Sequence, residues 1–139
     1  INTNDRFNDT KKAAEQGDVG AQMSLGFDYA SGEGIPQDDT EAAKWFRKAA
    51  EKGVAGAQLI LGRMYTAGEG VPKDDVVAYM WFNLAATSIE YEPAKIHRSK
   101  LLLKMTTEQI AEGDAMTRKW LEDFEKKTAK KNDGSPVTP

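Results

Sequence analysis

A glycine-rich, acidic segment occurs twice in the chain, as SGEGIPQDD at residues 31–39 and AGEGVPKDD at residues 67–75. Glycines beside paired aspartates suit a phosphate-binding loop, a calcium-binding loop or a turn between helices. A phosphate loop needs a preceding β-strand and usually a lysine beside Ser or Thr. A calcium loop needs oxygen ligands at alternate positions over about 12 residues. The segment has neither pattern, so we interpret both copies as turns between helices.

Other catalytic or metal-binding groups are scarce in this sequence. The chain has no cysteine and a single histidine, His97, which leaves no Ser-His or Cys-His couple and no site with several histidine ligands. A Ser-x-x-Lys motif is also missing. The carboxylates cluster at expected helix starts and on polar faces, where capping and solvation explain them. We therefore expect no enzymatic activity and no cofactor or metal, and we interpret His97 as a structural or solvated residue.

Length and charge limit the remaining classes of function. The chain has 139 residues, 40% of them hydrophobic, with 19 Lys plus Arg against 22 Asp plus Glu and a net charge of -3. One domain is expected, and neither nucleic acid nor membrane insertion is expected, because the overall charge is negative and no apolar run approaches ~20 residues. The sequence begins at Ile1, so two locations stay open: the cytoplasm, or the periplasm or exterior if a signal peptide was removed before Ile1.

Residues on both sides of the turn also recur at an interval of 36 positions. Both sets have the spacing of one helical face, which predicts that each repeat is a pair of helices. In the first helix the matched residues are Ala21, Gln22, Leu25, Gly26 and Tyr29 and, in the second copy, Ala57, Gln58, Leu61, Gly62 and Tyr65. In the second helix they are Ala42, Trp45, Phe46, Ala49 and Ala50 and, in the second copy, Ala78, Trp81, Phe82, Ala85 and Ala86.

The turn residues have separate expected roles. The first glycine of each copy ends a helix in the left-handed conformation, and the second keeps the turn tight. The proline fixes φ ahead of the next helix, and an aspartate caps that helix. These residues are Gly32, Gly34, Pro36 and Asp38 or Asp39 in the first copy, and Gly68, Gly70, Pro72 and Asp74 or Asp75 in the second.

Two glycines inside the expected helices, Gly26 and Gly62, need a compensating contact. Glycine in a helix costs roughly 0.5–1 kcal/mol relative to alanine. We expect the bulky residues of the partner helix to lie over the space that the missing Cβ leaves. These are the Trp-Phe pairs at 45–46 and 81–82.

The segment AQMSLGFDYASGEGIPQDDTEAAKWFRKAAEKG resembles a Sel-1-like repeat, a relative of the tetratricopeptide repeat. The resemblance depends on the ordered combination of Ala-Gln, Leu-Gly, Tyr, Gly-x-Gly-x-Pro, Asp, Ala-x-x-Trp and Ala-Ala-x-x-Gly. It implies an all-α fold, an α/α superhelical solenoid of antiparallel helix pairs. The second copy departs at its end, where AATSIE replaces the AAEKG helix stop.

The expected domain organisation follows from this pattern. A single repeat domain spans residues 1–129, and residues 130–139 form a disordered tail. The domain divides into a half repeat at 5–17, repeats at 18–53 and 54–89, and a capping pair of helices at 90–128. The last helix is expected to place one apolar face against the solenoid, made of Ile110, Met116 or Thr117, Trp120, Leu121 and Phe124.

The resemblance also implies a binding surface. In tetratricopeptide relatives the first helices line a concave groove, and the residues that follow the core Gln, Gly and Tyr point into it. Carried onto this chain, the rule selects Met23, Phe27, Ala30, Leu59, Arg63 and Thr66. Apolar residues beside an arginine suit a protein or peptide partner. The alternative is that Met23 and Phe27 pack against the neighbouring repeat.

Two functions follow from these expectations. The first is a non-enzymatic interaction module that binds a peptide or a partner helix in the groove. The second is a structural segment of a longer or self-associating solenoid. Weak self-association is expected through the half repeat, because Phe7, Ala13 and Ala14 lack the helix that would cover them.

Overall fold

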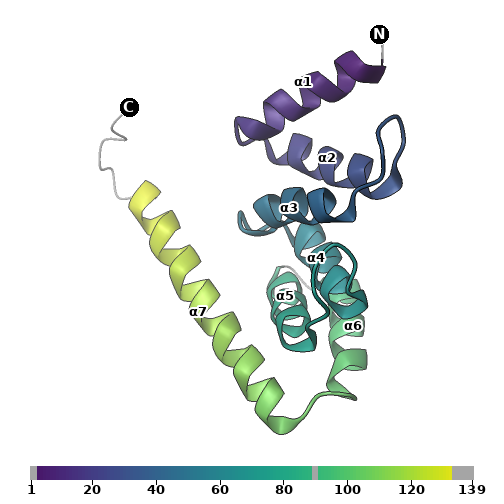
Figure 1. Ribbon diagram of the computed structural model, residues 1–139. Helices are drawn as coiled ribbons and strands as arrows, with labels where there is room; N and C mark the ends of the chain where they lie inside the picture. The colour runs from purple at the N-terminus through teal and green to yellow at the C-terminus, as the bar shows by residue number, and fades with distance from the viewer. Residues whose placement is uncertain (1–2, 89–90, 133–139) are drawn as a thin grey trace.

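The computed structural model of the protein describes residues 3–88 and 91–132. This part of the chain contains helices and no strand, which confirms the prediction of an all-α fold (Figure 1). The helices are α1 (Thr3–Glu15), α2 (Val19–Ser31), α3 (Asp39–Ala50), α4 (Ala55–Ala67), α5 (Asp75–Thr87), α6 (Glu92–Leu102) and α7 (Thr107–Asn132).

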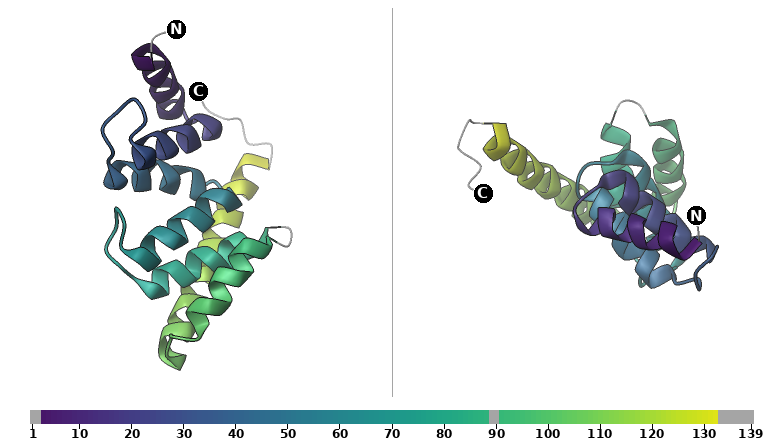
Figure 2. Two further views of the ribbon diagram at one scale, coloured as in Figure 1. Left: turned by 90° about the vertical axis from the view of Figure 1, so that its right-hand side faces the viewer. Right: turned by 90° about the horizontal axis from the view of Figure 1, so that it is seen from above.

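Helices α1 to α6 form a stack in which each helix packs on its neighbours in the chain (Figures 1 and 2). The pairs α2–α3 and α4–α5 are the two complete repeats. By the interval of 36 residues, α1 takes the place of a second helix and α6 that of a first helix. The helices α2, α4 and α6 therefore share one side of the stack, as the solenoid predicts.

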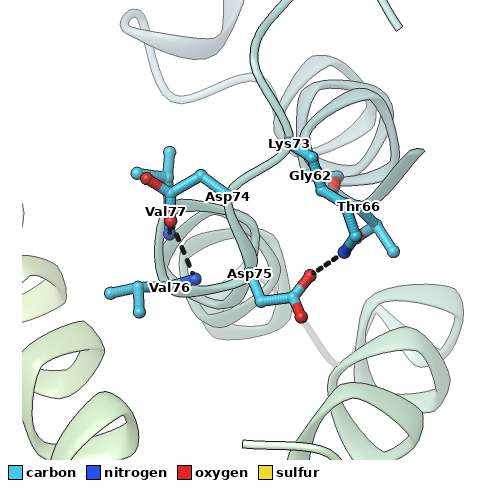
Figure 3. A network of polar contacts seen from close by, with 7 residues as sticks. All are labelled: Gly62, Thr66, Lys73, Asp74, Asp75, Val76 and Val77. Carbon is cyan, nitrogen blue, oxygen red and sulfur yellow. Dashed lines mark hydrogen bonds and ion pairs between the residues drawn. The ribbon is translucent and has the colours of Figure 1, made fainter. Parts of the chain in front are cut away.

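The repeated segment is a turn, as the sequence indicated. Gly32 and Gly68 end α2 and α4 with φ of 72° and 71°, which only glycine adopts without strain from a Cβ atom. The Asp38 carboxylate accepts a 3.1 Å hydrogen bond from a backbone amide in the first turn of α3. The Asp74 carboxylate accepts hydrogen bonds of 3.0 and 3.1 Å from two backbone amides in the first turn of α5 (Figure 3). These caps satisfy amides that have no partner within the helix.

The two glycines inside the helices are covered by phenylalanine rings. A Cβ atom at Gly26 would lie 2.5 Å from the Phe46 ring, and one at Gly62 would lie 2.5 Å from the Phe82 ring. Both rings are almost fully buried. The close approach of the helices therefore requires glycine at these positions, and ring packing offsets the cost in helix propensity.

The two tryptophans of the repeats lie elsewhere in the core. Trp45 packs with Ala14 and Leu25 and is 8% exposed. Trp81 is 2% exposed and packs edge-to-face on Trp120 of α7, with ring centroids 6.2 Å apart. The phenylalanine of each Trp-Phe pair thus covers the glycine, while the tryptophan also contacts a further helix, α1 for Trp45 and α7 for Trp81.

The last two helices do not form the expected capping pair. Within the described residues, α6 and α7 both pack on α5, from opposite sides, and make little contact with each other (Figure 1). The Tyr79 ring lies over Gly113 of α7, and the Tyr79 hydroxyl donates a 2.7 Å hydrogen bond to Asp114. The Asn83 amide also donates to the Thr117 hydroxyl at 3.2 Å. These contacts hold α7 along the side of the second repeat instead of over its end.

The apolar face expected for α7 is the face that packs. Met116, Trp120 and Leu121 lie against the core cluster around Trp81, and Ile110 lies against the cluster around Phe82.

The C-terminal end of α7 differs from the expectation. The helix continues to Asn132, beyond the expected start of a disordered tail at Lys130, because Lys130 and Lys131 in its last turn favour the negative end of the helix dipole. This part of α7 projects away from the stack (Figure 2). Residues 133–139 of the expected tail lie outside the described residues.

Two of the three large exposed apolar residues in the described part of the chain lie near the opposite end from the expected one. Phe7 packs edge-to-face on Tyr29 with ring centroids 5.8 Å apart, and Ala14 is 1% exposed. The expectation that these residues lack a cover was wrong, because α2 and α3 supply the contacts. The large exposed apolar residues near the C-terminal end of the stack are Ile96 and Leu103, with exposures of 52% and 88%.

Candidate functional site

A cavity of about 440 Å³ opens between α2 and α4, and residues of α3 form part of its lining. Its volume falls within the range of about 300–1,000 Å³ that is usual for binding pockets. The residues that line it are Phe27, Ala30, Gln37, Asp39, Phe46, Ile60, Arg63, Met64, Ala67 and Glu69. First helices supply most of this lining, because the solenoid turns the same side of each first helix toward the same surface.

Two phenylalanines make the apolar part of this cavity. Phe27 lies edge-to-face on Phe46, with ring centroids 5.1 Å apart and an interplanar angle of 77°. Phe46 is buried, whereas Phe27 stays 51% exposed. An aromatic side chain that is half in water yet held by a buried ring offers a rigid contact surface at low entropic cost.

The polar part of the cavity centres on Arg63. This exposed residue of α4 forms no ion pair within the described residues, although Asp39 and Glu69 also line the cavity. A guanidinium group offers its donors in a planar fork that matches a carboxylate. The cavity therefore combines an apolar ring surface with a cation that is free to bind an acidic group.

The structure brings three of the six expected groove residues together. Phe27, Ala30 and Arg63 line the cavity. Met23 and Leu59 do not, because both are half-buried in packing between repeats. The alternative reading of Met23 as an inter-repeat contact is therefore the better one, and Leu59 has the same kind of environment.

Met23 and Leu59 contact different parts of the core. Met23 packs against the cluster that contains Phe46 and Met64, and Leu59 packs against the cluster that contains Phe82 and Leu101. Part of each side chain is therefore used in core packing.

A second, smaller cavity occupies the corresponding place one repeat further along. It has a volume of about 160 Å³ and is lined by Thr66, Phe82, His97, Lys100, Leu101 and Lys104. Thr66, the sixth expected groove residue, lies here. Its hydroxyl donates a 3.0 Å hydrogen bond to the Gly62 carbonyl (Figure 3), so Thr66 contributes mainly its methyl group to the cavity.

His97 forms part of the wall of this second cavity. Its ring stacks on Phe82 with centroids 5.3 Å apart and an interplanar angle of 22°. Burial lowers the pKa of His97 below its usual value of 6.5, and the nearby cations Arg63 and Lys100 lower it further. His97 is therefore mostly uncharged at neutral pH, in a field that the neighbouring cations make positive.

Several residues of the two cavities were not identified as site residues from the sequence. Phe46 and Phe82 were assigned to the core, where most of each ring does lie. Lys100 and Lys104 were not singled out at all. The available signal was the interval of 36 residues, since it relates Ala30 to Thr66 and Phe46 to Phe82 and so relates the first cavity to the second.

The described residues offer neither a metal-binding cluster nor a helix that could span a membrane. Residues 3–88 and 91–132 contain no group of three or more His, Cys, Asp or Glu side chains placed to hold a metal ion. Among the same residues, no helix combines the length and the apolarity that a membrane span requires.

The fold defines a class of protein, an α/α solenoid built from short helical repeats. The Sel1 repeat model matches residues 10–18, 19–54 and 55–88. The chain therefore belongs to the Sel1 repeat family, as the resemblance of its sequence predicted. Sel1 repeat proteins are generally protein-interaction modules, and their fold is typically a non-enzymatic scaffold.

Solved structures with similar folds agree with this assignment. One is a protective antigen of uropathogenic Escherichia coli strains that displays an SLR fold. Its sequence is 30% identical to this chain, and the match covers 96% of this chain with a TM-score of 0.81. A Sel1 repeat protein from Oxalobacter formigenes is 40% identical with a TM-score of 0.60 over 65% of this chain. The chain spans only 29% and 26% of these two proteins. A search of curated proteins gives no match.

Proposed function

We propose that the protein is a non-enzymatic interaction module that binds a segment of another protein in the cavity between α2 and α4. An apolar side chain of this segment packs on Phe27 and Phe46, and an acidic group of the segment binds Arg63. The observation that carries the proposal is the exposed Phe27 ring held against a buried ring, beside a cation without an ion-pair partner in the described residues. Anchors of this kind, aromatic rings and arginines, dominate the energy of protein interfaces.

The composition of the cavity supports a protein segment over a small polar metabolite. Its lining contains Ala30, Ile60, Met64 and Ala67 in addition to the two rings. Methionine adapts its shape to different apolar partners. This apolar lining beside the charged residues Arg63, Asp39 and Glu69 resembles a protein interface, in which an apolar centre is surrounded by polar residues.

A binding experiment with matched variants tests the proposal. A partner isolated by pull-down is titrated by calorimetry into the wild type, Arg63→Glu, Phe27→Ser and the control Arg118→Glu. The control makes the same charge change on the exposed surface of α7. We expect Arg63→Glu to weaken binding by roughly 1.5–3 kcal/mol, the scale of a hydrogen bond to a charged group, and Phe27→Ser to weaken it similarly. The control should bind as the wild type does.

Thermal melts of the same variants separate binding from folding. Phe27 and Arg63 are exposed, so their substitutions should leave the melting temperature almost unchanged. If binding survives both changes in the cavity, the partner occupies another face and the proposal is wrong. If Phe27→Ser unfolds the protein, the ring is part of the core and is not a contact for a partner.

A second function has an observation of its own. Ile96 and Leu103 are exposed apolar residues near the end of the stack formed by α6, where a solenoid without a polar terminal unit tends to associate. A structural role, in which this face packs on a further repeat or on another copy, would use these residues. Sedimentation of the wild type and of Ile96→Ser with Leu103→Ser at rising concentration tests it, since only the wild type should associate.

A further inference from the structure

The cations near the second cavity have no acidic partner in the described fold. Lys100 and Lys104 line the cavity, and Arg63 is close enough to shift the pKa of His97. Within residues 3–88 and 91–132, none of these three cations forms an ion pair, and no acidic residue lines the cavity. Although the chain has a net charge of -3, the groove is therefore positively charged around the second cavity. This positive charge attracts acidic groups.

The size of the cavity limits what can enter it. A volume of about 160 Å³ is below the usual range of about 300–1,000 Å³ for pockets that bind whole small molecules. A single side chain is the right size. The stacked rings of Phe82 and His97, together with Leu101, make one part of the wall apolar, which suits the methylene groups of a glutamate whose carboxylate reaches Lys100 or Lys104.

We propose that the second cavity binds an acidic side chain of the same protein segment that places an apolar side chain on Phe27 and Phe46. This inference rests on the proposed function. The two cavities flank α4, because Arg63 lines the first and Thr66, one turn further along the helix, lines the second. A helix with its side chains is about 10–12 Å across, and an extended chain advances about 3.3 Å per residue. The segment therefore carries its acidic residue about three positions from its apolar anchor.

Selection from a random peptide library tests this spacing. The library is displayed on phage and selected on the full chain as wild type, as Lys100→Glu with Lys104→Glu, and as the control Arg118→Glu with Lys126→Glu. Both double variants change the net charge equally, but the control residues lie on exposed positions of α7. The wild type and the control should select peptides with an apolar residue and, at the expected spacing, Asp or Glu. The Lys100 and Lys104 variant should keep the apolar preference and lose the acidic one.

Synthetic peptides then measure the effect. The strongest selected peptide and its Glu→Gln or Asp→Asn analogue are titrated into each protein. In the wild type the analogue should bind about tenfold more weakly, a little more than one exposed ion pair supplies, because two lysines act on one carboxylate. In the Lys100→Glu, Lys104→Glu variant the affinity for the acidic peptide should fall at least about tenfold. The acidic peptide should then no longer bind more tightly than its neutral analogue. Added salt should reduce the difference in the wild type.

Each other outcome overturns the inference. Selected peptides without an acidic preference, whose binding is still lost with Phe27→Ser, would overturn it and leave the proposed function intact. Peptides that are insensitive to both Phe27→Ser and the Lys100 and Lys104 variant would overturn both proposals, as would the absence of any selected peptide. Displacement of the peptide by millimolar inorganic phosphate, with phosphate binding abolished in the lysine variant, would show an anion site in place of a site for an acidic side chain.

Discussion

The two complete repeats share a sequence pattern but differ in what surrounds it. Trp45 and Trp81 hold equivalent positions in α3 and α5. The Trp45 ring is covered by the half repeat and by the Lys48 ammonium group, 5.7 Å from the ring centroid. The Trp81 ring is covered by Trp120, which stacks in turn on Phe124. The same side chain is therefore at the edge of the core in one repeat and at its centre in the other.

The groove shows a second difference between the repeats. Phe27 of the first repeat corresponds to Arg63 of the second, and both line the larger cavity. The matched positions of a repeat build the scaffold, and the unmatched positions between them make the surface that a partner would meet. The comparison teaches that repetition determines where side chains point, while the neighbours of each repeat determine how much each contact stabilises the fold.

The largest effect should distinguish the two tryptophans. We expect Trp81→Ala to cost about 4–5 kcal/mol of unfolding free energy and Trp45→Ala about 3 kcal/mol, because the cost of removing a large aromatic grows with the cavity left behind. Denaturation with guanidinium, followed by circular dichroism, measures both. Equal costs for the two variants would contradict the distinction drawn from their surroundings.

A smaller effect should show what the two repeats have in common. We expect Gly26→Ala and Gly62→Ala each to cost about 1–3 kcal/mol, because a Cβ atom would overlap a buried phenylalanine ring, which would have to shift from its packed position. Gly56→Ala in α4 is the matched control. A Cβ atom there meets only a Met23 methyl at 4.0 Å, so the gain in helix propensity should stabilise the protein by about 0.5–1 kcal/mol. Stabilisation by all three variants in denaturant titrations would show that no close helix contact exists.

The aspartate caps should have a smaller effect again. Asp74 accepts hydrogen bonds from two amides of α5, whereas Asp38 accepts one from α3. We expect Asp74→Ala and Asp38→Ala to lower the unfolding free energy by about 1 kcal/mol each, with Asp74→Ala the larger. Glu122→Ala on the exposed face of α7 should stay within about 0.5 kcal/mol of the wild type. The reverse order of the two caps would contradict the hydrogen-bond pattern.

The smallest effect concerns His97. This residue of α6 corresponds to Leu61 of α4 by the interval of 36 residues. Its pKa is lowered below 6.5 by burial and by the cations Arg63 of α4 and Lys100 of its own helix, while α5 contributes the uncharged Phe82 ring. The unfolded chain therefore holds the proton more tightly than the native chain does. The free energy of unfolding should fall as the pH drops below about 6.5 and should level off below the native pKa.

Comparison with His97→Gln isolates this contribution from the other titrating groups. The melting temperature of the wild type should fall more than that of the variant when the pH is lowered from about 7.5 to about 5.5, across the usual range of histidine titration. A constant difference between the two proteins over this range would mean that the pKa of His97 is the same in the folded and unfolded chains.

The sequence by itself determined the helices, their turns and the family. Each of these depends on neighbours within a few positions: Gly32 and Gly68 adopt left-handed conformations, Asp38 and Asp74 cap the first turn, and the apolar residues recur with helical spacing. Three of the expected groove residues, Phe27, Ala30 and Arg63, also line one cavity, because one repeat position points the same way in every repeat.

Only the tertiary structure decided the rest. The placement of α7 depends on Gly113 beneath Tyr79 and on Trp120 against Trp81, contacts between residues more than 30 positions apart that no local pattern specifies. The same packing between distant residues half-buried Met23 and Leu59 and placed Lys100 and Lys104 around the second cavity. Periodicity can assign a side chain to a face of its helix, but the side chains of other helices decide whether that face is core, groove or solvent.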